Sequence, residues 1–473
     1  MSVIILCILA AVEVLLAVWC IKNQTAGFLE RAYVRAGELT LFVIFTIIPV
    51  LKGGLRYQLL AAALVIRAIV ALIVLWRQKK KEDAHKQTYR VTRVVIRAAG
   101  SVLVFAVALI PAFIFPQYQE PRVTGTHEVA TAVYTYEDPD RIESFNSNNE
   151  PRKVTVEFWY PKDWDHNEQY PLVLFSHGAF GVRSANTSTY QELASNGYVV
   201  GALDHPYHSM FSSDAMGNIT LISQDFLASV LACNNGTYVD REKYEQEQQW
   251  MKLRVADIEF ILDRILKEHA TSQTDKEQIT ASQTEKEEAA DSQFNEDNQI
   301  NEVFRMIDPK KIGMAGHSLG GAAGAQVARE KNDIDAVVCL DATMMGEYVD
   351  YDDESHCEIF CDEPYPVPII RFYTDDIMKA LEQLPEDSEF VDRVAGAGAP
   401  ADYEVYYEHT NHMSLTDLTL VSPCMVKLIV NTANLKNGAQ TQNPRQVLES
   451  MNSTILHFFD YYLKGQGDNN EIT

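Results

Sequence analysis

The sequence predicts an α/β domain, a mostly parallel sheet covered by helices on both faces, preceded by an all-α transmembrane region of about four helices. Two observations carry this prediction. Long apolar stretches fill residues 1–120, whereas short apolar runs alternate with helical patterns from about Lys153 onward. We therefore divide the chain into a membrane region (1–120), a linker and domain entry (121–152) and an α/β domain (153–473).

The N-terminal region contains four apolar stretches that we predict to cross a membrane: Val3–Ile21, about Ala36–Leu55, Leu59–Trp76 and Ala98–Phe115. A helix needs about 20 mostly apolar residues to cross a bilayer. The second stretch falls furthest short, because its purely apolar part is confined to Leu39–Leu51. A cleaved signal peptide explains the first stretch poorly, since no basic segment precedes it and further apolar stretches follow.

Basic residues are concentrated between the third and fourth apolar stretches. The segment 77–97 carries Arg77, Lys79, Lys80, Lys81, Lys86, Arg90, Arg93 and Arg97. Because loops rich in Lys and Arg stay in the cytoplasm, we expect this segment inside and the chain after Phe115 outside. The predicted location is a cell membrane crossed several times, with the large C-terminal domain on the extracytoplasmic side.

Two charged side chains, Glu13 and Arg67, lie within predicted spans. An unpaired charge is costly inside a bilayer, so we expect pairing among Glu13, Arg67 and Glu38. An ion pathway is the alternative, which two such residues support less well than structural pairing does.

The net charge of −25 is unevenly distributed along the chain. Residues 1–120 hold 14 Lys and Arg against 6 Asp and Glu, so the remainder holds 26 against 59, a balance of −33. A domain this acidic does not bind nucleic acid by neutralising phosphates, which excludes nucleic acid as a partner.

The C-terminal part alternates predicted strands with predicted helices. The strands are "KVTVEFWYP", "YPLVLFSHG", "YVVGALDH", "IGMAGHS", "IDAVVCLDA", "PVPIIRFYTDD" and "YEVYYEHTNH". Within 248–268, the apolar residues Met251, Val255, Ile258, Leu262 and Ile265 follow a helical spacing and predict one buried face. Residues 269–301 are polar and contain a near-repeat, "TSQTDKEQ" and "ASQTEKEE", so we expect a mobile surface insertion there.

One motif combines a serine with two glycines. Gly316-His317-Ser318-Leu319-Gly320 matches G-x-S-x-G, follows the predicted strand "KIGMA" and precedes a helix-prone run of small residues. A strand–turn–helix arrangement of this kind holds a serine hydroxyl clear of the sheet, as a nucleophile requires. A glycine turn without chemistry is the simpler alternative.

An activated serine also needs an oxyanion hole. The residue after the serine usually gives one backbone donor, here Leu319, and a loop after an earlier strand gives the other. The run "LVLFSHGAFG" ends a predicted strand, and we assign the second donor to the amide of Ala179. A plain turn between strand and helix is the alternative for this loop.

The base and the acid should follow the serine in the chain. We prefer His412 to His409 as the base, because it lies nearer the loop that could reach Ser318. Either histidine could instead be a polar residue that is satisfied by hydrogen bonds and has no catalytic role. The acid is Asp341 or else Asp375 or Asp376, all at predicted strand ends, and spacing does not decide between them.

A second group, Asp204, His205 and His208, has residue types that bind metals. No third cluster of ligands accompanies it, so we expect neither a metal nor another cofactor.

These motifs together resemble the α/β-hydrolase fold, and within it the plasma-type platelet-activating factor acetylhydrolase and dienelactone-hydrolase-like families. The likeness covers about Val154 to Gly465 and includes "FSHGAFG", "LASNGYVVGALDHPYHS", "GHSLGG", "LDATM", "HTNHMSLTD" and "HFFDYYLKG". In the acetylhydrolases the acid follows the strand after the nucleophile helix, which implies Asp341, and the late histidine corresponds to His412, with Asp417 downstream. The family hydrolyses short or truncated acyl chains of phospholipids without a metal.

The chain departs from this pattern in the spans, in Leu319 where the acetylhydrolases usually have phenylalanine, and in the insertion at 269–301. The resemblance implies a serine carboxylic-ester hydrolase, with Ser318, His412 and Asp341 as its catalytic triad and a lipid-like or small ester as its substrate, and the predicted spans add an anchor in the membrane. The alternatives are an esterase or lipase for other secreted or polymeric esters and a non-catalytic membrane sensor. The oligomeric state is left open.

Overall fold

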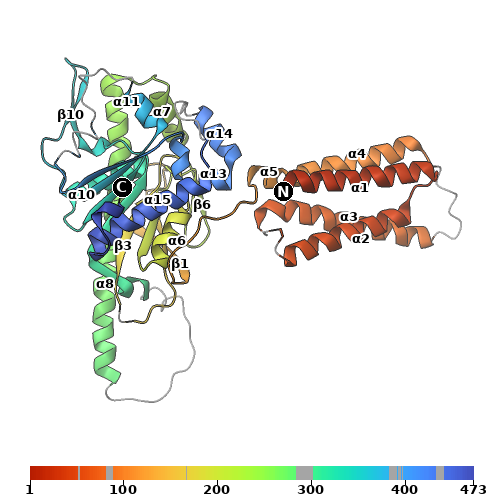
Figure 1. Ribbon diagram of the computed structural model, residues 1–473, viewed down its shortest axis with the longest axis horizontal. Coiled ribbons are helices and arrows are strands. Elements are labelled where there is room, and N and C mark those ends of the chain that lie inside the picture. Colours follow the sequence, from red (N-terminus) through yellow and green to blue (C-terminus); the bar gives the residue numbers. More distant parts are fainter. Residues whose placement is uncertain are drawn as a thin grey trace. The chain divides into compact units, whose positions relative to one another are not determined.

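The computed structural model describes residues 1–472, apart from 49, 52–53, 81–88, 167, 284–301, 383–390, 392–395, 397 and 433–440. The chain divides into two compact units (Figure 1). The first comprises Met1–Gln119 with Leu420–Lys427, and the second comprises Glu120–Thr419 with Leu428–Thr473.

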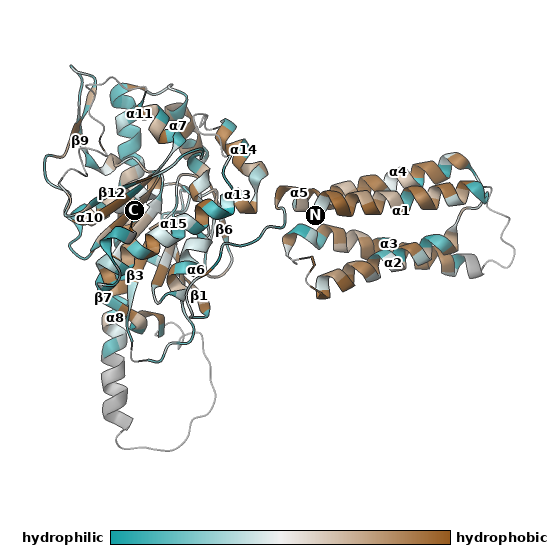
Figure 2. Cartoon of the chain, in the orientation of Figure 1, coloured by the Kyte–Doolittle hydropathy of each residue, from teal (hydrophilic) through white to brown (hydrophobic). Residues whose placement is uncertain are grey.

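The first unit is helical. Its helices are α1 (Ser2–Lys22), α2 (Phe28–Ile47), α3 (Leu55–Lys80), α4 (Val91–Ala108) and α5 (Ile110–Ile114). They are predominantly apolar along their length (Figure 2). Within the described ranges, three stretches are long and apolar enough to cross a membrane: Ser2–Lys22, Leu55–Arg77 and Val91–Ala108.

Helix α2 falls short of the same measure. It starts with a charged segment that contains Glu30, Arg31, Arg35 and Glu38, and it ends at Ile47, before the predicted second stretch ends. The apolar part inside the helix is therefore shorter than the roughly 20 residues of a typical span, and the structure does not show a fourth span among the residues that it describes. A fourth span remains a prediction, while the stretch predicted at Ala98–Phe115 begins earlier, at Val91, and is continued by α5.

The charged residues of the apolar helices pair with one another. The carboxylate of Glu13 in α1 accepts from the guanidinium groups of Arg35 and Arg67, and Arg35 also binds Glu38 at 3.0 Å. The predicted pairing is confirmed. Each charge has an opposite charge as neighbour, which removes much of the cost of placing it among apolar side chains.

The second unit is built on an eight-stranded sheet in the order β1-β2-β4-β3-β7-β8-β11-β12. The strands are β1 (Val129–Ile142), β2 (Pro151–Pro161), β3 (Tyr170–Ser176), β4 (Val199–Asp204), β7 (Ile307–His317), β8 (Ala336–Leu340), β11 (Ile369–Thr374) and β12 (Asp402–Tyr407). From β4 to β12 every neighbouring pair of strands is parallel. Strand β2 pairs antiparallel with both of its neighbours, β1 and β4. All seven predicted strands are confirmed.

Strand β1 lies within residues 121–152, where we expected only the linker and domain entry. Its side chains are half-buried along most of its length, because it is the edge strand and forms a long antiparallel ribbon with β2. This ribbon extends the sheet beyond its parallel strands at one edge. The described residues also form two small sheets, β5 (Phe211–Ser213) with β6 (Ile219–Leu221) and β9 (Tyr348–Asp352) with β10 (Cys357–Phe360).

Helices cover both faces of the sheet. On one face, Leu172 and Leu174 of β3 join a buried cluster with α8 (Asp240–Gln283) and α10 (Leu319–Glu330). On the other, Phe175 of β3 packs its ring 5.0 Å from that of Tyr190 in α6 (Thr187–Ser195), which contacts α15 (Pro444–Phe459). Alternate residues of one strand thus face opposite layers, and the parallel strands are buried on both sides.

The helix predicted at 248–268 lies within α8, and its five apolar residues are buried. Helix α8 continues to Gln283, so the first half of the predicted insertion at 269–301 is helical. Residues 284–301 lie outside the described residues.

The turn between β7 and α10 depends on Gly320. A Cβ atom at this position would lie 2.1 Å from the carbonyl oxygen of Ser176 in the neighbouring strand β3. A Cβ at Gly324, one turn later in the same helix, would meet only the flexible end of Met314, at 3.0 Å. The end of a methionine side chain can move aside, whereas the backbone of a central strand cannot. Replacing the two glycines by alanine should therefore have different effects on stability.

We predict that Gly320→Ala lowers the free energy of unfolding by about 2 kcal/mol or more, because it forces the elbow and β3 apart. Gly324→Ala should leave stability within about 1 kcal/mol of the parent, since alanine favours the helix. Thermal unfolding of the detergent-solubilised chain checks both. Equal effects of the two substitutions would contradict this account of the elbow.

Candidate active site

Ser318 occupies a sharp turn between the end of β7 and the start of α10. Its backbone has a φ of 54° and a ψ of −130°. A positive φ is costly for a residue with a side chain and marks a position that the surrounding structure enforces. The Ser318 amide donates to the carbonyl of Leu340 in β8 at 2.9 Å, which ties the elbow to the neighbouring strand.

The loop after β3 closely approaches this serine. A Cβ placed on Gly178 would lie 3.0 Å from the Cβ of Ser318 and 2.8 Å from Nδ1 of His317. A glycine is therefore needed where the loop passes the elbow. Ala179, the predicted second oxyanion donor, follows this glycine directly, and Leu319 is the first residue of α10.

His412 and Asp341 are in direct contact. Nδ1 of His412 lies 2.7 Å from Oδ2 of Asp341, and this carboxylate is buried. Asp341 follows β8 and also accepts from the amide of Thr374 at 2.7 Å and from its hydroxyl at 2.8 Å. These donors orient the carboxylate toward the imidazole.

His412 begins a short 3₁₀ helix, His412–Leu415, in the loop after β12. Asn411 caps this turn in a reciprocal pair with Ser414, and the His412 amide donates to Oδ2 of Asp376 at 2.7 Å. Burial disfavours the charged imidazole, but the hydrogen bond that the ring donates to Asp341 and the charges of Asp341 and Asp376 outweigh it and raise the pKa of His412. The imidazole is thus prepared to accept a proton.

The other candidates for the base and the acid, His409, Asp375 and Asp376, have different contacts. The side chain of His409 is exposed and lies 3.6 Å from Glu408. The Asp375 carboxylate accepts from the amide of His409 at 2.9 Å and from the hydroxyl of Tyr406 at 2.8 Å. Of the three candidate acids, Asp341 is the one whose carboxylate contacts the His412 ring, whereas Asp375 and Asp376 bind backbone amides of the histidine loop.

His317, inside the serine motif, supports the histidine loop. Its Nε2–H donates to the carbonyl oxygen of His412 at 2.9 Å. Burial and the neighbouring charge of His412 lower the pKa of His317 to about 3, so the ring stays neutral and keeps this donor. Apart from the position of His317 beside the serine, no sequence pattern indicates this role.

The loop that contains Ala179 is held by a buried arginine that the sequence analysis did not identify. Arg254 of α8 donates to the carbonyl of His177 at 2.7 Å and to that of Gly178 at 3.2 Å. Burial lowers the pKa of Arg254 to about 9, which leaves it positive at neutral pH. Arg254 lies three residues after Met251, on the apolar face of the helix, and an arginine on such a face is the signal that could have revealed it.

Asp204, His205 and His208, the alternative metal group, each have other partners. Asp204 binds Arg183, and His205 bridges Asp257 at 3.0 Å and the hydroxyl of Ser176 at 2.9 Å. The ring of His208 stacks on Phe226, with 3.7 Å between centroids. Within the part of the chain that the structure describes, no three His, Cys, Asp or Glu residues are grouped to hold a metal ion.

Asp417, five residues after His412, ties the histidine loop to α6. Its carboxylate accepts from the amide of Ser188 at 2.7 Å and from its hydroxyl at 2.6 Å. Burial raises the pKa of Asp417 to about 6. Because these two hydrogen bonds join the residues after His412 to α6, Asp417 helps to hold the loop that carries the imidazole.

Comparison with known families assigns the chain to one of them. The sequence model of the family described as platelet-activating factor acetylhydrolase, isoform II, matches residues 148–472. The chain belongs to this family. All five candidate residues, Ser318, Asp341, His412, Ala179 and Leu319, lie within the matched part.

Individual relatives of this acetylhydrolase family are distant. The platelet-activating factor acetylhydrolase of the dog, Canis lupus familiaris, is 26% identical over 202 residues, which cover 39% of this chain and 38% of the relative. That of the guinea pig, Cavia porcellus, is 26% identical over 312 residues, or 64% of this chain and 61% of the relative. The chain thus covers less than two thirds of the length of each.

A solved structure supports the fold. The ferulic acid esterase from Streptomyces cinnamoneus superimposes with a TM-score of 0.50 over 76% of this chain and 96% of the esterase, at 18% identity. Together with the sheet order and the family match, it confirms the α/β-hydrolase fold for the second unit of this acetylhydrolase family member.

Proposed function

We propose that the protein is a membrane-anchored serine carboxylic-ester hydrolase that acts on short or truncated acyl esters of phospholipid-like substrates. The observation that carries the proposal is the 2.7 Å contact between His412 and the buried Asp341, beside the strained elbow of Ser318. A serine, an aspartate and a histidine in this chain order, each following a strand of one parallel sheet, are typical of acyl transfer by the α/β-hydrolase fold.

In the first half-reaction the Ser318 hydroxyl attacks the ester carbonyl while Nε2 of His412 takes its proton. Asp341 keeps the Nδ1 proton of the ring in place and stabilises the imidazolium that forms. The amides of Ala179 and Leu319 donate to the tetrahedral oxyanion, each worth about 3–4 kcal/mol of barrier.

The intermediate collapses when His412 protonates the leaving alcohol, which leaves the acyl group on Ser318. In the second half-reaction His412 removes a proton from water, and the resulting attack releases the acid and restores the serine. No step in this sequence requires a metal or another cofactor.

The apolar helices support the proposed location of the reaction at a membrane. Three of them are long and apolar enough to cross a bilayer, and the basic segment 77–97 between α3 and α4 favours a cytoplasmic position for that segment. The hydrolase domain then lies outside the cytoplasm, whether the region crosses three or four times, because only the span after this segment decides its side. Tethering keeps the site at high local concentration near lipid esters.

We expect Ser318→Ala and His412→Ala to abolish hydrolysis of a soluble short-chain aryl ester. Asp341→Asn should lower kcat by about 10³–10⁴-fold, because the ring loses its orientation and its charge partner. Asp376→Asn is the matched control, since this carboxylate contacts the His412 amide, and it should cost less than about tenfold. Equal losses in the two aspartate variants would contradict the choice of Asp341.

The substrate class is tested by comparing esters of one head group. A glycerophosphocholine with an acetyl or short oxidised chain should be hydrolysed with a kcat/KM at least about tenfold higher than the same lipid with a long chain, as for a site that selects acyl length. Soluble aryl and polymeric esters serve as the competing classes. A clear preference for either would exclude the phospholipid proposal while leaving the serine hydrolase intact.

A further inference from the structure

The β5–β6 hairpin, residues 210–222, follows the loop at the end of β4 and has two unlike faces. In its ladder Phe211 pairs with Leu221 and Ser213 with Ile219, while Ser212 pairs with Thr220. Residues directly opposite each other share a face, so Phe211, Ile219 and Leu221 project to one side and Ser212 and Thr220 to the other.

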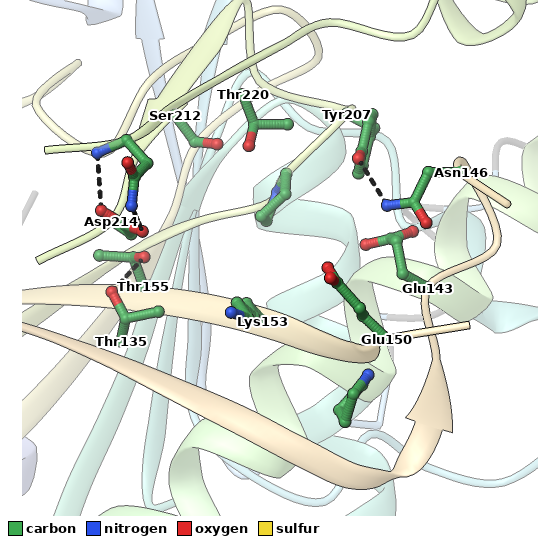
Figure 3. Close-up of a pocket in the computed structure, with 13 residues that line it drawn as sticks. Thr135, Glu143, Asn146, Glu150, Lys153, Thr155, Tyr207, Ser212, Asp214 and Thr220 are labelled. Carbon is green, nitrogen blue, oxygen red and sulfur yellow. Dashed lines mark hydrogen bonds between the residues drawn. The ribbon is translucent and has the colours of Figure 1, made fainter. Parts of the chain in front are cut away.

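The polar face of the hairpin covers a small pocket of about 120 Å³ (Figure 3). Ser212 and Thr220 line one wall, and Thr155 and Lys153 of β2 line the other. This side of the hairpin therefore faces a pocket within the domain that is lined mainly by polar residues. A one-residue shift in the strand register would turn Ser212 and Thr220 outward and bury the apolar side chains. The pocket would then lose its polar wall, so the observed register is the one that fits the domain.

The opposite face is apolar and lies in solvent. Phe211 is 50% exposed, Ile219 68% and Leu221 66%, and Met216 at the tip is 82% exposed. Single exposed apolar residues are ordinary, but these four and Met210, which is 36% exposed, lie on one thirteen-residue hairpin and form a patch that indicates an interaction surface. Asp214 is the hairpin's single ionisable side chain, and its carboxylate accepts from the amides of Met216 and Asn218.

The hairpin is firmly held, and one of its anchors is the loop that carries Ala179. The amide of Met210 donates to the carbonyl of Gly181 at 3.1 Å. Arg183 donates to the carbonyl of Ser213 at 2.7 Å, and the amide of Ala215 donates to the hydroxyl of Thr135 at 2.9 Å. The apolar face therefore has a fixed orientation, and the hydrogen bond between Met210 and Gly181 links the hairpin directly to the loop that contains Ala179.

We propose that this apolar face, formed by Phe211, Met216, Ile219 and Leu221, is a lipid-contacting surface that enters the acyl region of a zwitterionic bilayer next to the active site. The inference rests on the proposed location at a membrane. The four side chains include no Lys or Arg, and Arg183, which binds the hydroxyl of Ser213 on the same face, is paired with Glu157 and Asp204. The domain around the patch is strongly acidic, so its complement is an uncharged surface.

A bilayer also suits the patch better than a protein does. A stable protein interface buries about 800 Å² on each partner, more than four side chains on one narrow hairpin supply. In a chain tethered by apolar helices, a small apolar contact is sufficient, because tethering already supplies the proximity. The contact would orient the mouth of the site toward lipid esters.

The test uses the full chain in phosphatidylcholine liposomes, with and without brominated acyl chains that quench tryptophan. Ile219→Trp is compared with Val349→Trp, which adds a tryptophan at a 58% exposed apolar residue on the separate β9–β10 hairpin. The signal of the parent's five tryptophans is subtracted. The added tryptophan at 219 should be quenched and blue-shifted, while that at 349 should be unaffected.

Two results would overturn the inference and leave the proposed hydrolase activity standing: no quenching at 219, or equal quenching at 219 and 349. Trp19 and Trp76 in the apolar helices report insertion of the parent. Their failure to be quenched would overturn the membrane location and this inference with it.

Activity gives a second readout. Ile219→Ser/Leu221→Ser should lower hydrolysis of a bilayer-embedded phospholipid ester severalfold and leave hydrolysis of a soluble short-chain ester unchanged. Val349→Ser is the matched control and should change neither. Equal loss on both substrates would show that the face serves the fold or the acyl pocket, which contradicts the proposal.

Discussion

The hydrogen bond between the His412 ring and Asp341 requires that residues 71 positions apart in the chain meet within 2.7 Å inside the protein. Parallel strands achieve this, because the carboxyl ends of β7, β8, β11 and β12 lie at one edge of the sheet in that order. Ser318 follows the first, Asp341 the second, Thr374 ends the third and the His412 loop follows the fourth. Each strand thus contributes one group to a single site, and the buried cores on both faces of the sheet keep the strand ends in register.

The site is supported from a second side by a buried polar network. Asp257 of α8 binds Arg152 at 2.7 Å and His205 at 3.0 Å, and Arg254, one turn earlier, holds the carbonyls of the loop before Ala179. Removing one member of such a network leaves a buried charge or polar group without its partner, which is strongly destabilising. The same helix face therefore contributes both to the core and to the position of the loop that contains Ala179.

Much of this could be predicted from the sequence, because it depends on local patterns. The seven strands are short apolar runs, and the elbow shows itself through its glycines and its strand–helix context. The acid could not be derived from spacing, since Asp341, Asp375 and Asp376 all follow adjacent strands and differ only in which atoms their carboxylates face. Arg254 was missed because its role depends on a tertiary contact with a loop 76 residues away. Strand β1 was missed because an edge strand is half-exposed and lacks a continuous apolar run.

The central claim is that the paired His412 and Asp341 activate Ser318. Labelling of the detergent-solubilised full chain with a fluorophosphonate probe tests it most directly, because the probe reacts with an activated serine and needs no knowledge of the substrate. The account predicts covalent labelling of the parent that disappears in Ser318→Ala and is strongly slowed in Asp341→Asn. A folded parent that is not labelled, or labelling that persists in Ser318→Ala, would contradict it.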